Sequence, residues 1–181
     1  MAVKVLLDTC VLFPTVMREV LLGVAGQGLY TPLWSARILE EWARAARKLG
    51  PEGETIARGE IAQLRAAWPK AEVVWKPSLE DRLWLPDVND RHVLAAAIAG
   101  SAEVLVTMNA SDFPRGLLAE EGLSRSDPDA FLLGFWQSNP EAVQEVCTRV
   151  LSTARRLSGD DWQMRPLLKK ARLPRLAKAV G

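Results

Sequence analysis

Acidic and amide side chains recur in four separate segments of this 181-residue chain, each next to a run that predicts a strand or a helix. Carboxylate oxygens are the ligands that Mg²⁺ and Mn²⁺ prefer, and carboxylates gathered in one place repel one another unless a cation neutralises them. The pattern therefore favours a hard-cation site, in which one or two ions can activate water for a displacement at phosphorus. The candidate residues are Asp8, either Glu40 or Glu41, Asp87, Asp90, Asn109 and Asp112.

Other catalytic chemistries fit these residue types less well. The chain has one histidine, His92, and two distant cysteines, Cys10 and Cys147, which disfavours a zinc site. A phosphatase of the haloacid-dehalogenase type would place a second Asp two residues after Asp8, where this chain has Cys10. No P-loop or dinucleotide-binding loop follows a predicted strand. We interpret Cys10 as a small packing residue and His92 as a side chain at the surface or the edge of the core.

The elements that must position these acids alternate between strands and helices. Val3 to Leu7 predicts a strand that is buried on both faces, with Asp8 at its carboxyl end. Val104 to Thr107 predicts another strand, which Asn109 and Asp112 follow. Ligands of open α/β sheets bind at the carboxyl ends of the strands, so we predict an α/β fold with a parallel sheet. The other elements predicted before residue 115 are helices over 15–25, 36–49, 54–68 and 90–99, and strands over 29–33 and 72–75.

The C-terminal part differs from the body in both pattern and charge. From Asp127 onward the sequence predicts helices only, over 127–138, 139–157 and from Ser158. Residues 151–181 carry eight Lys or Arg against two Asp, whereas residues 1–150 carry 15 basic and 20 acidic side chains. This asymmetry suggests a polyanionic partner for the tail, although the charges also suit the solvated face of surface helices.

Composition narrows the class of protein further. A hydrophobic content of 49% and a charged content of 25% are globular values. No run of about 18 apolar residues predicts a membrane span, and no signal-peptide pattern precedes the first strand. Two distant cysteines favour a cytoplasmic protein with reduced thiols. Trp34 and Trp84, two of seven tryptophans, flank loops next to the candidate acids, where they could stack on bases or pack in the core.

Taken together, these segments resemble the PIN-domain nucleases over roughly residues 3–115, in four motifs with the same order and spacing as in that family. The motifs are Val-Leu-Leu-Asp8-Thr-Cys-Val-Leu-Phe-Pro, Ser35 followed by Ile-Leu-Glu-Glu41, Asp87-Val-Asn-Asp90-Arg-His-Val-Leu-Ala-Ala-Ala, and Val-Leu-Val-Thr107-Met-Asn109-Ala-Ser-Asp112-Phe-Pro. The segment Ser126-Asp-Pro-Asp-Ala-Phe-Leu and the helices after it resemble the C-terminal extension of one bacterial branch of VapC-like toxins.

The resemblance implies a PIN-like α/β/α sandwich with a central parallel sheet in residues 1–125, and a basic helical extension packed on it in residues 126–181. It also implies a Mg²⁺- or Mn²⁺-dependent endoribonuclease in which Asp8, Glu41 and Asp90 bind the metal. Asp112 is the fourth catalytic acid of this pattern, and the accessory residues are Glu40 (the alternative to Glu41), Asp87, Thr107 and Asn109. Many members carry an Asp where this chain has Asn109.

The resemblance further implies an RNA substrate, a small antitoxin protein of a type II toxin–antitoxin pair, and a homodimer. Basic side chains of the extension would then contact RNA or the antitoxin, and these are Arg155, Arg156, Lys169, Lys170 and Arg172. Two alternatives keep the fold and change the function. One is a nuclease of RNA or DNA processing outside toxin–antitoxin systems, and the other, suggested by Asn109, is a module that binds RNA or a protein partner without cutting.

Overall fold

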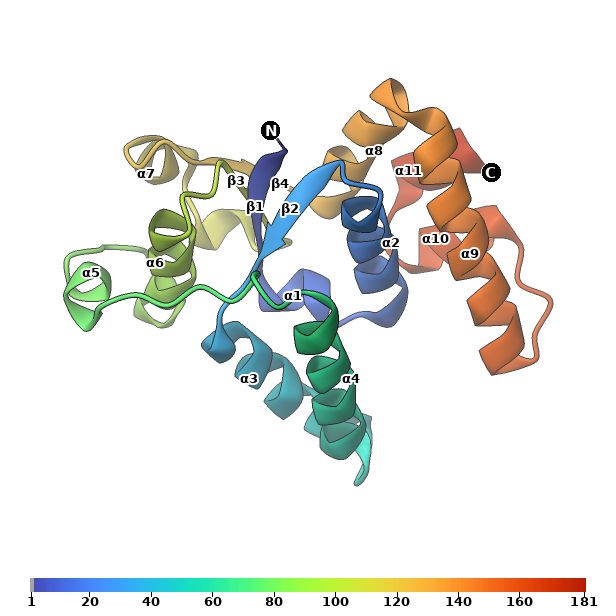
Figure 1. Ribbon diagram of the computed structural model, residues 1–181, viewed down its shortest axis with the longest axis horizontal. Coiled ribbons are helices and arrows are strands. Elements are labelled where there is room, and N and C mark those ends of the chain that lie inside the picture. The colour runs from blue at the N-terminus through green and yellow to red at the C-terminus, as the bar shows by residue number, and fades with distance from the viewer. Residues whose placement is uncertain (1) are drawn as a thin grey trace.

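The computed structural model describes residues 2–181, and a four-stranded parallel sheet lies at its centre (Figure 1). The strands are β1 (Val3–Leu7), β2 (Tyr30–Leu33), β3 (Val104–Val106) and β4 (Ser124–Ser126). Their order is β2-β1-β3-β4, so β1 has a neighbour on each side. The side chains of Val5, Leu6 and Leu7 are fully buried, which explains why this strand is continuously aliphatic.

Helices cover both faces of the sheet and the edge where its strands end. They are α1 (Thr9–Leu12), α2 (Thr15–Gly26), α3 (Ala36–Ala45), α4 (Gly53–Ala67), α5 (Pro77–Asp81), α6 (Arg91–Ala99), α7 (Arg115–Ala119), α8 (Pro128–Ser138), α9 (Pro140–Ser158), α10 (Met164–Lys170) and α11 (Pro174–Val180), with 3₁₀ turns η1 (Ala46–Leu49), η2 (Val88–Asp90) and η3 (Ala110–Asp112). In Figure 1, α6 and α7 lie on one side of the sheet and α2 on the other, while α1, α3 and α4 lie below the strand ends. The predicted α/β/α sandwich with C-terminal helices is confirmed. Among residues 2–181, no helix combines the length and the apolar character needed to cross a bilayer.

The predicted strand over residues 72–75 is wrong. Glu72 forms only an isolated bridge to Trp34, just past the end of β2, with flanking backbone hydrogen bonds of 3.1 and 2.8 Å. Val74 is 85% exposed, so the pairing does not continue into the core. The fourth strand is instead β4, whose Ser-Arg-Ser sequence pairs with β3 at the sheet edge. Its polar residues have no preference for strands, so β4 forms because its backbone pairs with the edge of β3.

The predicted helices are present, with some boundaries shifted. The helix predicted over residues 36–49 changes to the turn η1 after Ala45, and Gly50 then stops it with a φ of 121°. The last helices also begin later than expected. Gly159 ends α9 in the left-handed region, and α10 starts only at Met164 rather than at Ser158.

The C-terminal helix α8 contributes side chains to the same core as the sheet. Tyr30 of β2 contacts Phe131 and Phe135 of α8, with ring centroids 5.0 and 5.7 Å away, and its hydroxyl donates to the Leu21 carbonyl at 2.6 Å. The packing of Tyr30 against α8 therefore fixes this helix to the edge strand.

The longest C-terminal helix, α9, packs the side chain of Val146 directly against the backbone of α2 at Gly23. A Cβ placed on Gly23 would lie 2.5 Å from Val146 Cγ1, which is far inside contact distance. Gly23 therefore allows the close approach of the two helices. The division into residues 1–125 and 126–181 stays a prediction, and its boundary falls inside β4.

Candidate active site

The carboxyl ends of β1 and β3 open into a pocket of about 540 Å³. Three of the predicted acids line it, and they come from the end of β1, from α3 and from the start of α6. These acids are Asp8, Glu41 and Asp90, and Asn109 joins them from the turn after β3. The other candidates, Glu40, Asp87 and Asp112, lie outside the lining. The fold thus brings together three carboxylates that are far apart in the sequence.

Asp8 is held at the pocket by hydrogen bonds to both of its carboxylate oxygens. Its Oδ1 accepts from the backbone N–H of Thr9 at 2.8 Å, which caps α1, and its Oδ2 accepts from the Thr107 hydroxyl at 2.9 Å. The residue is only 7% exposed. Burial raises the pKa of Asp8, while the hydrogen bonds from Thr107 and Thr9 oppose that rise. The carboxylate is therefore fixed in orientation, and its charge is costly to bury.

A thiol and two backbone amides connect Asp8 to the turn after β3. Cys10 Sγ lies 3.5 Å from Asp8 Oδ2 and accepts from the Met108 N–H at 3.2 Å, while the Asn109 N–H donates to Thr107 Oγ1 at 3.0 Å. Burial, together with the charge of Asp8, raises the pKa of Cys10 to about 12. The thiol therefore stays protonated at neutral pH, which disfavours a nucleophilic role. The sequence predicts packing for Cys10, and the structure adds a polar contact that supports Asp8.

Asp90 lies among other acids where η2 meets α6. Burial, followed by the charges of Asp87, Asp112 and Asp8, raises the pKa of Asp90 to about 6. Asp87 itself caps η2 by accepting from the Asn89 N–H at 2.9 Å. Asp112 lies in η3 outside the pocket lining, and its negative charge contributes to the raised pKa of Asp90. A bound cation would relieve the mutual repulsion that these charges create.

The side chains of the two consecutive glutamates of α3 have different neighbours, because successive helical residues point about 100° apart. Glu41 lines the pocket, and its Oε1 lies 2.5 Å from His92 Nε2. Glu40 instead accepts two hydrogen bonds from Arg58, at 2.9 and 3.0 Å, and one from Arg44 at 3.2 Å. The hydrogen bonds from Arg58 lower the pKa of Glu40 to about 2. This geometry favours Glu41 over Glu40 as the glutamate of the site.

His92 is a residue whose importance the sequence analysis missed. It is expected at the surface or the edge of the core, yet the structure leaves it 1% exposed on α6, with Nε2 toward Glu41. Its Nδ1 is buried without a hydrogen-bond partner. His92 is therefore a positioning residue for Glu41. The signal that could have found it is its place two residues after Asp90, directly before the apolar run Val93–Ala99 of α6.

The carboxylates of the pocket carry the oxygen donors that hard divalent cations prefer. Among the described residues, no three His, Cys, Asp or Glu side chains lie close enough to surround one ion. Within that same part of the chain, neither Asp8 nor Asp90 lies within ion-pair distance of a Lys or Arg side chain. Mg²⁺ is commonly held by one or two carboxylates and keeps several waters, a pattern that these two acids match.

Basic side chains line the same pocket, and two of them come from the C-terminal extension. They are Lys48, Lys170 and Arg172. Of the other basic residues predicted to contact a partner, Arg155 donates to the Trp162 carbonyl at 2.7 Å and lies 4.0 Å from Asp161. Arg156 and Lys169 are exposed outside the pocket lining. The structure therefore separates the predicted set into two residues at the pocket and three away from it.

The two tryptophans with an open role differ in exposure. Trp34 is fully buried, so it packs in the core and cannot stack on a base. Trp84 is 68% exposed and lies beside Asp87 in a shallow surface pocket. Only Trp84 is therefore accessible to a ligand.

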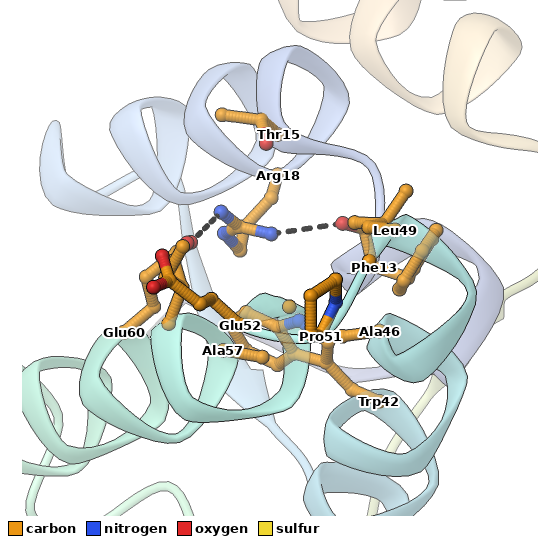
Figure 2. Close-up of a pocket in the computed structure, with 13 residues that line it drawn as sticks. Phe13, Thr15, Arg18, Trp42, Ala46, Leu49, Pro51, Glu52, Ala57 and Glu60 are labelled. Atoms are coloured by element: carbon orange, nitrogen blue, oxygen red, sulfur yellow. Dashed lines mark hydrogen bonds and ion pairs between the residues drawn. The ribbon is translucent and has the colours of Figure 1, made fainter.

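A second cavity, of about 380 Å³, lies between α2, α3 and α4 (Figure 2). Its centre is the buried Arg18, which donates to the carbonyls of Leu12 at 2.7 Å and Phe13 at 3.0 Å and pairs with Glu60. The guanidinium also lies 4.4 Å from the Trp42 ring centroid. The buried charge of this cavity, Arg18, is paired with Glu60, so its centre is neutralised from within the protein.

A parallel α/β sheet that presents polar side chains where its strands end defines a class of α/β domains whose ligand site lies at that edge of the sheet. The sequence model of the PIN domain matches residues 4–111, which is more than half of the chain. The chain therefore belongs to the PIN-domain family, and the resemblance seen in the sequence is confirmed. The match ends just before Asp112 and leaves the C-terminal helices outside it.

A named relative supports the likeness to VapC proteins. "Putative ribonuclease VapC50" of Mycobacterium tuberculosis (strain ATCC 25618 / H37Rv) is 44% identical over 57 residues. This stretch covers 32% of the present chain and 34% of the relative, so the likeness concerns about a third of each protein. No solved structure matches the chain.

Proposed function

We propose that this protein is a Mg²⁺- or Mn²⁺-dependent endoribonuclease and the toxin of a type II toxin–antitoxin pair. The observation that carries the proposal is the presence of two carboxylates, Asp8 and Asp90, that line one pocket without a basic partner in the described part of the chain. Membership of the PIN-domain family and the name of the VapC50 relative support ribonuclease activity over other uses of such a pocket.

In this proposal Asp8 and Asp90 hold the cation, and Glu41 orients its waters or joins as a further ligand. The chemistry that a divalent cation supplies in such a site is activation of water and stabilisation of the charge that develops at phosphorus. The Thr107 hydroxyl keeps Asp8 in one orientation at 2.9 Å, and His92 keeps Glu41 at the pocket. These contacts fix the acids before substrate arrives.

Asn109 replaces an acid of the family pattern and changes what that position can do. Its side chain lines the pocket and is exposed. An amide can bind a water of the cation or donate a hydrogen bond to a phosphate oxygen, whereas a carboxylate in the same place would repel the phosphate. We therefore assign Asn109 to substrate contact, and Asp112 to the negative field around Asp90.

The direct test is cleavage of single-stranded RNA by the purified full-length protein with Mg²⁺ or Mn²⁺, and again after chelation by EDTA. We expect cleavage with either ion and none above background in EDTA, because the acids alone cannot activate water. Single-stranded DNA is assayed beside RNA, and preferential cleavage of DNA would favour the processing nuclease instead. RNA binding without turnover in any divalent ion would overturn the enzyme assignment.

Substituting the two neighbouring glutamates separately tests the position on α3. Glu41→Gln is expected to weaken Mn²⁺ binding and metal-dependent cleavage by about 10-fold to 100-fold, because the cation loses a charged outer ligand. Glu40→Gln is the matched control, since it removes the same charge from the neighbouring residue. The Glu40 side chain faces Arg58 and lies outside the pocket lining. We expect less than about a twofold change there. Equal losses in both variants would contradict the assignment of Glu41.

The toxin role and the antitoxin partner are tested in cells. Expression of the chain alone should arrest growth, and co-expression with the small neighbouring reading frame should restore it and yield a co-purifying complex. Light scattering of the isolated protein and of the complex would show whether the expected homodimer forms. Normal growth on expression of a protein that cleaves RNA in vitro would favour RNA processing outside toxin–antitoxin systems.

A further inference from the structure

The C-terminal extension turns back toward the acidic pocket and places cationic side chains on its wall. Asp8, Glu41 and Asp90 line the pocket together with Lys170 and Arg172, from residues 170–172, where α10 ends and turns toward α11. Lys48, which follows α3, completes a set of three cations against three carboxylates. Side chains of opposite charge that face the same cavity usually form ion pairs or bind a charged ligand between them.

The two cationic residues of the turn have no acidic partner. Within residues 2–181, neither Lys170 nor Arg172 lies within ion-pair distance of an Asp or Glu, and both are exposed. The Lys170 ammonium lies 5.2 Å from the Trp162 ring centroid, which restricts it without neutralising its charge. The positive charge on this wall is therefore available to an external anion.

The backbone of the turn is rigidly anchored. Leu168 and Leu173, on either side of it, are fully buried, and the Leu173 N–H donates to the Leu168 carbonyl at 2.9 Å. The Arg172 N–H donates to the Lys169 carbonyl at 3.0 Å. Arg172 itself has a φ of 63°, a left-handed conformation that a non-glycine residue keeps only when its surroundings hold it. The position of Lys170 and Arg172 at the pocket is therefore built into the packing of α10 and α11.

Asp129 of α8 fixes the element that follows the turn. Its carboxylate accepts from the backbone N–H groups of Arg175 and Leu176, each at 3.0 Å, and from Arg175 Nε at 3.3 Å. Asp129 is only 6% exposed, so these contacts are buried. The start of α11, and with it the turn, is thereby tied to a helix that packs on the sheet.

We propose that Lys170 and Arg172 are phosphate-binding residues for the RNA substrate, so that the extension supplies one wall of the substrate site. The inference rests on the proposed function. RNA phosphates adjacent to the scissile one would lie against Lys170, Arg172 and Lys48, while the scissile phosphate faces the carboxylates and their cation. A cavity of about 540 Å³ has the size of sites that enclose small organic ligands, and a nucleotide fits that class. The family match ends at residue 111, so it assigns no role to these residues of the extension.

Polyanion binding has a measurable signature, because each phosphate contact releases counterions. For a single strand, the logarithm of the binding constant falls with the logarithm of salt concentration by about 0.7 per phosphate contact. Losing two such contacts should therefore lower the salt slope by about 1.4 and weaken binding by about tenfold. Removal of distant basic residues should leave the slope nearly unchanged.

The experiment measures binding of a short fluorescent single-stranded RNA to the full chain in EDTA, so that no cleavage interferes. Lys170→Ala/Arg172→Ala is compared with Arg156→Ala/Lys178→Ala, which removes the same charge from exposed positions outside the pocket lining. We expect about tenfold weaker binding and the reduced salt slope only in the first pair. Lys170→Arg/Arg172→Lys keeps the charges and should retain the slope.

Cleavage with Mn²⁺ then separates positioning from chemistry. The Lys170→Ala/Arg172→Ala variant should raise KM about tenfold with kcat changed much less, because the carboxylates and their cation are intact. If this variant loses helical circular dichroism, Lys170→Gln/Arg172→Gln, which keeps the side-chain stems, takes its place. RNA affinity and salt slope equal to those of the control pair would overturn the proposal. Equal RNA affinity together with lost co-purification of the co-expressed neighbour would assign the turn to a protein partner and overturn it as well.

The two hypotheses fail in different ways. A wild-type protein that binds RNA through Lys170 and Arg172 but never cleaves it with Mg²⁺ or Mn²⁺ would contradict the nuclease function and keep the phosphate wall. If the wild type and the Lys170→Ala/Arg172→Ala variant cleave RNA equally well, the nuclease function is kept and the proposed phosphate-binding wall is contradicted.

Discussion

Asp8→Asn is expected to lower metal-dependent RNA cleavage by about 1000-fold or more while leaving the fold intact. Binding a cation at a reacting phosphate contributes several kcal/mol to the stability of the transition state, and about 1.4 kcal/mol corresponds to each tenfold in rate. Asp8 is the least exposed carboxylate of the pocket and has no basic partner in the described chain. The amide has the same shape and can still accept from the Thr9 N–H, so the cap on α1 is kept.

The stability of the same variant gives an independent readout. Burial raises the pKa of folded Asp8 above its ordinary value of 3.8, so keeping it ionised at neutral pH opposes folding. Without divalent ions, Asp8→Asn should therefore be at least as stable as the wild type at neutral pH. This advantage should shrink as the pH falls through the folded pKa and vanish below 3.8, where Asp8 is protonated in both the folded and the unfolded states.

Single-turnover cleavage in Mn²⁺ measures the loss of activity. Thermal unfolding in EDTA, at neutral pH and at about pH 4, measures the change in stability. Asp160→Asn is the matched control, since it makes the same chemical change at an exposed position of the extension. Its cleavage rate and Tm should equal those of the wild type. Undiminished cleavage by a folded Asp8→Asn protein would remove Asp8 from the site and with it the proposed mechanism.

Asp129→Ala is expected to cost about 3 kcal/mol of unfolding free energy, the typical loss when one partner of a buried charged network is removed. The substitution leaves the backbone N–H groups of Arg175 and Leu176 without an acceptor at the start of α11. Because Leu176 and Ala177 are fully buried, water cannot replace the carboxylate without opening the packing. For a chain of this length the loss corresponds to a fall in Tm of about 10 °C.

The effect of Asp129→Ala on RNA cleavage tests whether the packing of the extension supports the pocket. If the turn with Lys170 and Arg172 is one wall of the substrate pocket, Asp129→Ala should raise KM for RNA at temperatures where the sheet is still folded. Asp161→Ala is the control, since that carboxylate is 91% exposed and its removal should change the stability by less than about 0.5 kcal/mol. A Tm equal to that of the wild type would show that Asp129 does not anchor the extension.

The sequence by itself determined three of the four strands and most of the helices, and it predicted Asp8 and Asp90 as candidate acids, both of which line the pocket. The aliphatic run from Val3 to Leu7 can be satisfied only by burial on both faces, so a central parallel strand with Asp8 at its end follows from local pattern. The alanine-rich helix α6 and its preceding Asp90 are equally readable, because spacing and capping act over a few residues.

The tertiary structure alone decided which neighbouring groups act on those acids. Thr107 supports Asp8 from 99 residues away, and the choice between Glu40 and Glu41 depends on which of them faces His92 and which faces Arg58. The strand β4 likewise exists because β3 offers a free edge, since its own residues carry no strand preference.

The same limit applies to the basic tail. Its charge is plain in the sequence, where it fits a polyanion partner and a solvated helix face equally well. Only the packing of α8, α10 and α11 shows that Lys170 and Arg172 reach the pocket while Arg156 and Lys169 do not. Local preferences act over a few residues, whereas the site forms from contacts between distant segments, and those contacts exist only in the folded chain.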